Sequence, residues 1–197
     1  MTAQIRPASS SDLEQIKAIM DLGFAADPTV RWVLPAAESF LTAHRKYVAI
    51  SAAPALVHRS AYLTTDLTGA AIWYPPGVSM DYATLDEVAR AEIPAKLWQD
   101  FSDLIDACGQ YRPKEPHWSL ELLAVDPIAR GRGIGAQLLS QGIAACGTPR
   151  LPIYLESSNP RNLTTYQREG FELLAKVQLP GTPPRFPMLR KAQYEPG

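Results

Sequence analysis

The alternation of strand-like and helix-like segments between Trp118 and Leu189 restricts this chain to few folds. Trp118–Val125 and Leu151–Glu156 have the apolar character of strands, and Gly133–Cys146 between them has the pattern of a helix. A helix that joins two strands in this way usually brings them together in parallel. The pattern therefore predicts an α/β core with some parallel pairing.

The end of the chain continues the alternation. A second helix is expected from Asn159 to Gly170, because Asn159 is a good N-cap, Pro160 suits the first helical position and Gly170 suits the position after the last. Phe171–Gln178 and Phe186–Leu189 are expected to complete the β elements.

The first 110 residues mix strand and helix signals without an internal repeat or a low-complexity linker. The expected elements are strands at residues 4–6, 61–65 and 70–76, a helix that follows Ser11, a helix over 36–58 interrupted at Pro54, and a helical segment over 81–109 broken at Pro94. Because the length suits one hydrophobic core, we predict a single domain over residues 1–197.

Composition excludes several classes of protein. The hydrophobic fraction of 46% and charged fraction of 20% are ordinary, and no stretch approaches the roughly 20 apolar residues of a membrane span. Nineteen basic against 20 acidic residues give no global field for nucleic acid, and the first residues lack an export signal. Neither Cys108 and Cys146 nor the three histidines have metal-site spacing. We expect a soluble, cytoplasmic monomer or homodimer that binds no metal, membrane or nucleic acid.

A glycine-rich turn, Arg130-Gly131-Arg132-Gly133-Ile134-Gly135, lies between a predicted strand and a predicted helix. Free N–H groups and the helix dipole make such a place an anion site, and glycine lets the backbone approach phosphate oxygens. The turn lacks the Gly-Lys-Ser/Thr of a Walker loop, and Leu138 stands where a dinucleotide fingerprint needs glycine. A different phosphate-bearing ligand is predicted; the alternative is a turn whose glycines only satisfy local geometry.

The spacing Arg130-x-x-Gly133-x-Gly135 after an apolar strand resembles the signature Arg/Gln-x-x-Gly-x-Gly/Ala of the GNAT superfamily. The likeness extends over about residues 117–175, through Leu122-Leu123-Ala124-Val125-Asp126-Pro127, Tyr154-Leu155-Glu156, Asn159, Asn162, Tyr166, Gly170 and Phe171. Two strings resemble the puromycin N-acetyltransferase group: Arg112-Pro113-Lys114-Glu115-Pro116-x-Trp118 and Leu155-Glu156-x-Ser158-x-Pro160-Arg161-Asn162-Leu163. The first half of the chain resembles that group only loosely.

The resemblance implies a mixed, centrally splayed β-sheet of about six to seven strands flanked by helices. It also implies an acetyl-CoA-dependent N-acetyltransferase that acts on a primary amine of a small molecule in a ternary complex. Residues 1–110 would mainly form the acceptor side, and residues 117–175 the acetyl-CoA-binding core. The implied cofactor-binding residues are Ala124, Val125, Arg130, Gly131, Arg132, Gly133, Ile134, Gly135, Ala136, Asn159, Asn162 and Tyr166.

The implied chemistry needs a proton acceptor, because an alkylamine with a pKa of about 10.4 arrives protonated at neutral pH. Glu121 is the first candidate, since it stands on the strand that enters the glycine turn, in the same alternation as Leu123 and Val125. Glu156, at the end of the adjacent predicted strand, is the second. Either carboxylate could instead bind the ammonium group, or be an ordinary solvated or ion-paired side chain.

The resemblance places Tyr166 close to the cofactor sulfur, where it would donate a proton to the leaving thiolate. The alternative for Tyr166 is a core tyrosine packed beside Phe171. Capping alone explains Asn159, whereas Asn162 is the better candidate to bind the amides of the pantetheine arm. Several aromatic side chains could line an acceptor pocket or belong to the core: Phe24, Trp32, Trp73 and Tyr74.

Two other functions stay open at this point. The same catalysis could act on a protein or peptide amine, or the domain could bind acyl-CoA as a sensor without transferring the acyl group. A closed aromatic pocket would favour a small-molecule acceptor, and an open groove would favour a protein.

Overall fold

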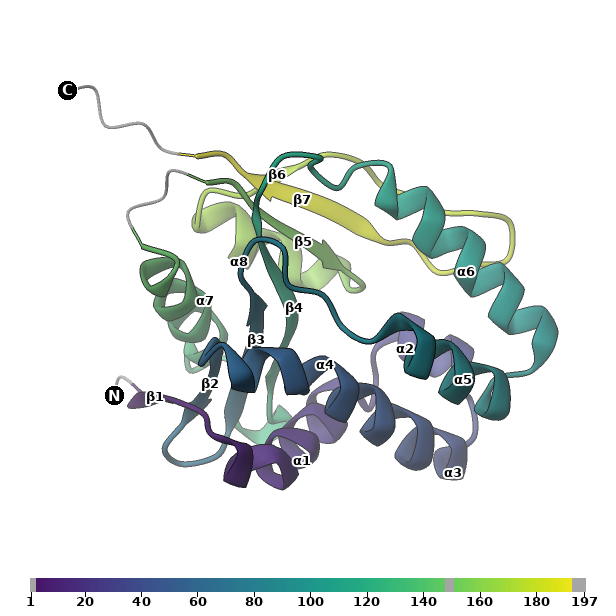
Figure 1. Ribbon diagram of the computed structural model, residues 1–197, viewed down its shortest axis with the longest axis horizontal. Helices are drawn as coiled ribbons and strands as arrows, with labels where there is room; N and C mark the ends of the chain where they lie inside the picture. Colours follow the sequence, from purple (N-terminus) through teal and green to yellow (C-terminus); the bar gives the residue numbers. More distant parts are fainter. Residues whose placement is uncertain (1–2, 148–150, 193–197) are drawn as a thin grey trace.

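The computed structural model describes residues 3–147 and 151–192 (Figure 1). Within these ranges seven strands form one sheet in the order β1-β2-β3-β4-β5-β7-β6. Their bounds are β1 Ile5–Pro7, β2 Ala61–Thr64, β3 Gly69–Tyr74, β4 Trp118–Val125, β5 Ile153–Ser157, β6 Glu172–Leu173 and β7 Phe186–Arg190. The β4–β5 pair is parallel and the other pairs are antiparallel. The predicted mixed sheet is confirmed.

Helices cover both faces of this sheet. They are α1 Leu13–Phe24, α2 Pro28–Val33, α3 Ala37–Ser39, α4 Arg45–Val57, α5 Tyr82–Glu92, α6 Ala95–Gly109, α7 Ile134–Ala145 and α8 Leu163–Arg168. Shorter helical turns lie at Ser10–Asp12, Phe40–His44, Pro127–Ala129 and Pro160–Asn162. The break predicted at Pro94 separates α5 from α6, and the helix predicted after the glycine turn is α7.

Each face of the sheet has its own hydrophobic cluster. On one face, Ile16 and Met20 of α1 and Val48 of α4 pack against Ile72 and Leu122 of the sheet. The other cluster packs α7 and α8 against the sheet and includes Tyr62, Trp73, Leu120, Leu138, Leu139, Tyr166 and Phe171. The α1–α4 face and the α7–α8 face therefore have separate cores with β3 and β4 between them (Figure 1).

The helix predicted over residues 36–58 differs from the structure in two ways. It does not stop at Pro54, because α4 continues to Val57, and a π-helical turn at Phe40–His44 separates α3 from α4. Proline inside a helix costs about 3 kcal/mol, but Ala52 and Ala55 are fully buried against the sheet on either side of it. Tertiary burial therefore outweighs the local preference.

The strand predicted over residues 171–178 is much shorter than expected. Only Glu172–Leu173 pairs with β7 as a strand, and an isolated bridge joins Val177 to Arg185. The intervening segment leaves the sheet and runs beside α6 (Figure 1), where Val177 packs against Leu104 and Cys108. Helix α2 was not predicted, although Asp27 as N-cap and Pro28 at the first position are the expected signals.

Candidate active site

Strands β4 and β5 part in the middle of the sheet. They pair only at Trp118, Ser119 and Leu120 of β4, while β4 continues to Val125 and stays paired with β3 alone. The backbone groups of Glu121–Val125 that face β5 therefore have no strand partner among residues 3–147 and 151–192. Unpaired N–H and C=O groups of this kind can bind an extended ligand that itself contains amides.

Glu121 is the extra residue of a β-bulge. The β3–β4 register passes from Ile72↔Leu122 to Trp73↔Leu120, so Glu121 has no partner on β3. The expected alternation with Leu123 and Val125 is wrong, because a bulge interrupts the period of two. Leu123 and Val125 pack with the α7–α8 cluster, whereas the charge of Glu121 acts on tyrosines of the α1–α4 face. The structure places this carboxylate on the α1–α4 side.

The surroundings of Glu121 alter its ionisation. Its side chain is 11% exposed, and its Oε1 atom lies 3.8 Å from Nη2 of Arg112. Burial raises the pKa of the Glu121 carboxyl, and the positive charge of Arg112 offsets part of that rise. A carboxyl group with a raised pKa is a better match for a general base near neutral pH.

Three tyrosines lie near enough to Glu121 for its negative charge to affect their pKa. Burial first, and the charge of Glu121 second, raise the pKa of Tyr47 to about 12 and raise the pKa of Tyr74 and Tyr82 as well. The Tyr74 hydroxyl donates to the backbone oxygen of Ser51 at 2.7 Å. These phenols stay protonated at neutral pH, so they add no charge of their own near the carboxylate. Of these three tyrosines, the sequence analysis had named only Tyr74 as a candidate for the acceptor pocket.

Glu156 lies in the same buried region but is already paired. Its Oε2 atom is 3.1 Å from Nη2 of Arg185, and its Oε1 atom accepts from the Tyr154 hydroxyl at 3.1 Å. Both partners of the ion pair are largely buried, with 16% and 12% of the Arg185 and Glu156 side chains exposed. A carboxylate held in this way is less available to take a proton from a ligand. Glu121 is therefore the stronger candidate for the base.

The glycine turn has the geometry of an anion site. Gly131 and Gly133 both have φ of 78°, the left-handed region that favours glycine, and α7 begins directly after Gly133. The first intrahelical bond comes from the Gln137 N–H, which leaves those of Ile134–Ala136 free. Arg132 is exposed, whereas Arg130 donates from Nη2 to the Gly23 carbonyl at 2.9 Å. The backbone amides, rather than the Arg130 guanidinium, are therefore the groups that this turn offers to an anion.

Tyr166 is 7% exposed and packs edge-on against Phe171, with ring centroids 6.1 Å apart. Burial, and then the charge of Asp27, raises the pKa of Tyr166 to about 12. Within the described residues its hydroxyl makes no hydrogen bond, so a ligand can accept from it. Asn159 accepts from the Arg161 N–H at 3.0 Å and caps the turn before α8, while the exposed Asn162 side chain has no partner in the same ranges.

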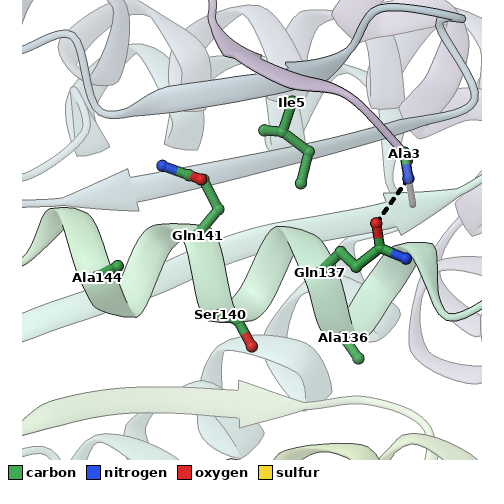
Figure 2. Close-up of a pocket in the computed structure, with 7 residues that line it drawn as sticks. All are labelled: Ala3, Ile5, Ala136, Gln137, Ser140, Gln141 and Ala144. Carbon is green, nitrogen blue, oxygen red and sulfur yellow. Dashed lines mark hydrogen bonds between the residues drawn. The ribbon is translucent and has the colours of Figure 1, made fainter.

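A shallow groove of about 430 Å³ lies between β1 and α7 (Figure 2). It is lined by Ala3, Ile5, Ala136, Gln137, Ser140, Gln141 and Ala144, and the Ala3 N–H donates to Oε1 of Gln137 at 2.7 Å. Ala136 and Ser140 project from α7 away from Ile5 (Figure 2). Among the described residues the lining has no titratable side chain, so none of these seven residues can carry out acid–base chemistry.

Among residues 3–147 and 151–192 no three His, Cys, Asp or Glu side chains are grouped to hold a metal ion. No helix in those ranges has the length and apolar character needed to cross a membrane.

Comparison with known proteins gives a family match for part of the chain. Residues 96–173 match the acetyltransferase (GNAT) domain family. Mycothiol acetyltransferase of Mycobacterium leprae is 32% identical over an alignment of 106 residues, and the match covers 41% of this chain and 34% of the relative. Mycothiol acetyltransferase of Gordonia bronchialis is 33% identical over an alignment of 96 residues, and the match covers 41% of this chain and 31% of the relative. The chain thus spans about a third of the length of these relatives, and no clear link to puromycin N-acetyltransferase emerged.

Solved structures match along nearly the whole chain. A Corynebacterium glutamicum protein described as histone acetyltransferase HPA2 and related acetyltransferase has a TM-score of 0.73 and 24% identity over 99% of both chains. Arylalkylamine N-acetyltransferase 2 of Aedes aegypti has a TM-score of 0.70 and 13% identity over 97% and 99%. Polyamine N-acetyltransferase of Drosophila melanogaster has a TM-score of 0.69 and 14% identity, and the match covers 96% of this chain and 100% of that one. The chain therefore has the fold of the GNAT acetyltransferases, and its residues 96–173 match their domain family.

Proposed function

We propose that this chain is an acetyl-CoA-dependent N-acetyltransferase that transfers the acetyl group to a primary amine of a small molecule by direct attack in a ternary complex. The main support is the stretch Glu121–Val125 of β4, which is paired with β3 but not with β5. It runs toward the glycine turn at the start of α7. One continuous surface thus offers partners for an amide-containing arm and for a pyrophosphate.

The residues of this surface fit the two halves of coenzyme A. The free N–H groups of Ile134–Ala136 and the open space over Gly131 suit a pyrophosphate, since a Cβ atom on Gly131 would meet nothing within 4 Å. The backbone edge at Ala124 and Val125, which has no partner on β5, suits the pantetheine amides. Residues 117–175 would form this cofactor core and residues 1–110 mainly the acceptor side of a single domain over 1–197.

Bound acetyl-CoA would supply the thioester carbonyl carbon that an amine attacks. In this proposal Glu121 removes a proton from the amine nitrogen, because its carboxylate lies on the bulge at the start of the unpaired stretch. Tyr166 donates its phenolic proton to the sulfur, since burial keeps that hydroxyl protonated. Glu156 keeps Arg185 paired and contributes indirectly.

The cysteines support direct attack rather than an acyl-cysteine route. Burial raises the pKa of Cys108 to about 11 and of Cys146 to about 12, so both thiols stay protonated at neutral pH. A protonated thiol is a poor nucleophile. No acyl group is therefore expected on the enzyme, and the amine itself is the attacking group.

The acceptor is proposed to be a small primary amine. The buried carboxylate of Glu121 can hold an ammonium group, and the aromatic side chains around it add surface for an organic substituent. Relatives of the same fold are described as polyamine and arylalkylamine N-acetyltransferases, which makes agmatine and tryptamine rational first probes. The likeness of two sequence strings to the puromycin N-acetyltransferase group remains a prediction.

Calorimetric titration with acetyl-CoA tests the cofactor site. The native protein is expected to bind, and Gly133→Glu with Gly135→Glu is expected to abolish binding, because two carboxylates would face the pyrophosphate. Gly147→Glu is the matched control: Gly147 also has a positive φ, 79°, and is exposed, but it follows the other end of α7. A folded native protein that gives no heat at millimolar acetyl-CoA would refute the proposed function.

Tyr166→Phe tests the proton donor. The variant keeps the ring that packs against Phe171 and loses only the hydroxyl, so turnover is expected to fall by about 100-fold with little change in acetyl-CoA affinity. Release of free thiol reports turnover, and calorimetry reports affinity. Unchanged turnover would leave Tyr166 with a packing role only.

A further inference from the structure

The turn between α1 and α2 bridges the two strands that part. Just before this turn, Gly23 in the last turn of α1 lies against β4, so closely that a Cβ atom there would be 2.5 Å from Cβ of Ala124. At its end Asp27 contacts Ser158, the residue after β5. Both contact points lie beyond the last β4–β5 pair. Residues 23–27 therefore cross one face of the opening from one strand to the other.

Two long-range hydrogen bonds fasten this turn. Nη2 of Arg130 donates to the Gly23 carbonyl at 2.9 Å, and the Ser158 hydroxyl donates to Oδ2 of Asp27. The first bond joins the turn to the segment after β4, and the second joins it to the segment after β5. The turn is thus held at both sides of the opening.

The bond to Ser158 is additional to helix capping. Oδ1 of Asp27 accepts from the N–H groups of Thr29 and Val30, each at 3.0 Å, and so caps α2. Capping needs only this one oxygen. The other oxygen is free to accept from Ser158, and Asp27 as a whole is only 7% exposed. A buried carboxylate with both oxygens engaged holds its position firmly.

Asp27 also lies near the proposed proton donor. Its negative charge adds to burial in raising the pKa of Tyr166, which places the carboxylate and the phenol in the same buried region. We propose that Asp27 and Ser158 are a positioning pair that holds residues 23–27 closed over the thioester end of the bound cofactor, beside Tyr166. This inference rests on the function proposed above. Without the hydrogen bond between Asp27 and Ser158, residues 23–27 would move away from the cofactor arm, and the cofactor would dissociate faster.

Three substitutions separate closure from capping. Ser158→Ala removes the bond. Asp27→Ser keeps an N-cap side chain, but one that is too short to bond to Ser158. Asp27→Asn keeps the N-cap and is also long enough to bond to Ser158. We expect the first two to raise the dissociation rate of acetyl-CoA about tenfold, as befits a hydrogen bond to a charged group, and Asp27→Asn to change it less. The double variant Ser158→Ala, Asp27→Ser should add little, since both changes remove one bond.

The matched control is Thr84→Ala. Thr84 Oγ1 donates to Oδ2 of Asp81 at 2.7 Å in a comparable hydroxyl–carboxylate pair at the start of α5, on an exposed surface. Stopped-flow displacement of acetyl-CoA, followed by tryptophan fluorescence, gives the dissociation rates. Hydrogen exchange of residues 22–30 without cofactor should also be faster in Ser158→Ala.

The two proposals fail differently in this experiment. If native protein does not bind acetyl-CoA, the proposed function is wrong. If it binds, but Ser158→Ala and Asp27→Ser dissociate at the native rate, the positioning pair is wrong even where their melting temperatures fall. Faster dissociation in both variants, with Thr84→Ala unchanged, supports the closure of residues 23–27 over the cofactor.

Discussion

Glu121→Gln is expected to lower turnover by about 10²- to 10⁴-fold while leaving the fold at least as stable as the native one. Glutamine has nearly the shape of glutamate but cannot accept the amine proton. It also removes a buried negative charge whose nearest cation, Nη2 of Arg112, is 3.8 Å away. Arg112 is 37% exposed, so water can solvate it when the carboxylate is gone. Loss of activity without loss of stability is typical of a catalytic group held in an unfavourable place.

The pH dependence has a definite sign. Because burial raises the pKa of Glu121 in the folded protein, the folded state holds that proton more firmly than the unfolded chain. This stabilisation is fully present below the ordinary pKa of glutamate and is lost as pH rises through the raised pKa. Activity follows the opposite course, because the carboxylate must be ionised to take the amine proton. Glu121→Gln should abolish both trends.

The measurements are thiol release with an accepted primary amine, agmatine and tryptamine being tried first, and thermal unfolding at acidic and neutral pH. Glu156→Gln is the matched control, because the Glu156 side chain is equally buried but bonded to Arg185. Leaving Arg185 without its partner should destabilise the fold by about 3–5 kcal/mol. Native turnover in Glu121→Gln would exclude Glu121 as the base, and equal destabilisation of the two variants would show that Glu121 is a structural ion-pair residue.

Local signals predicted the part of the fold that carries the cofactor surface. Strand β4 was predicted with the bounds it has, because its apolar run ends at Asp126-Pro127. The glycine-rich sequence predicted a turn between a strand and a helix, and in the structure Gly131 and Gly133 both have a positive φ of 78°. These features depend on residues close together in the sequence, so backbone sterics and capping were sufficient to find them.

Features that depend on pairing between distant residues were not predicted. The bulge at Glu121 arises from the register of β4 against β3, and no local pattern marks it. The Asp27–Ser158 contact joins positions 131 residues apart. A propensity argument also failed at Pro54, because the buried alanines beside it favour helix only through contact with the sheet. Such long-range terms cannot be read from the order of residues alone.

Gly142→Ala is expected to destabilise the protein, although the same change in an exposed helix would stabilise it by about 1 kcal/mol. Gly142 lies inside α7, and a Cβ atom there would be 2.1 Å from Cε2 and 2.3 Å from Nε1 of Trp73. Trp73 is 1% exposed and cannot move without disturbing the α7–α8 core. Overpacking of this kind typically costs 1–3 kcal/mol or more, which lowers the melting temperature by roughly 2–4 °C per kcal/mol.

The clash should also weaken acetyl-CoA binding, because a shift of α7 moves the N–H groups at its first turn. Trp73→Phe removes the indole atoms that a Cβ atom at Gly142 would meet. The double variant Trp73→Phe, Gly142→Ala should therefore lose less free energy of unfolding than the sum of the losses in the two single variants. Ala144→Gly, at an exposed position of the same helix, measures the propensity effect alone. If Gly142→Ala melted at or above the native temperature, the close approach of α7 to β3 would not be a constraint on this fold, and the position of the cofactor turn would have to depend on other contacts.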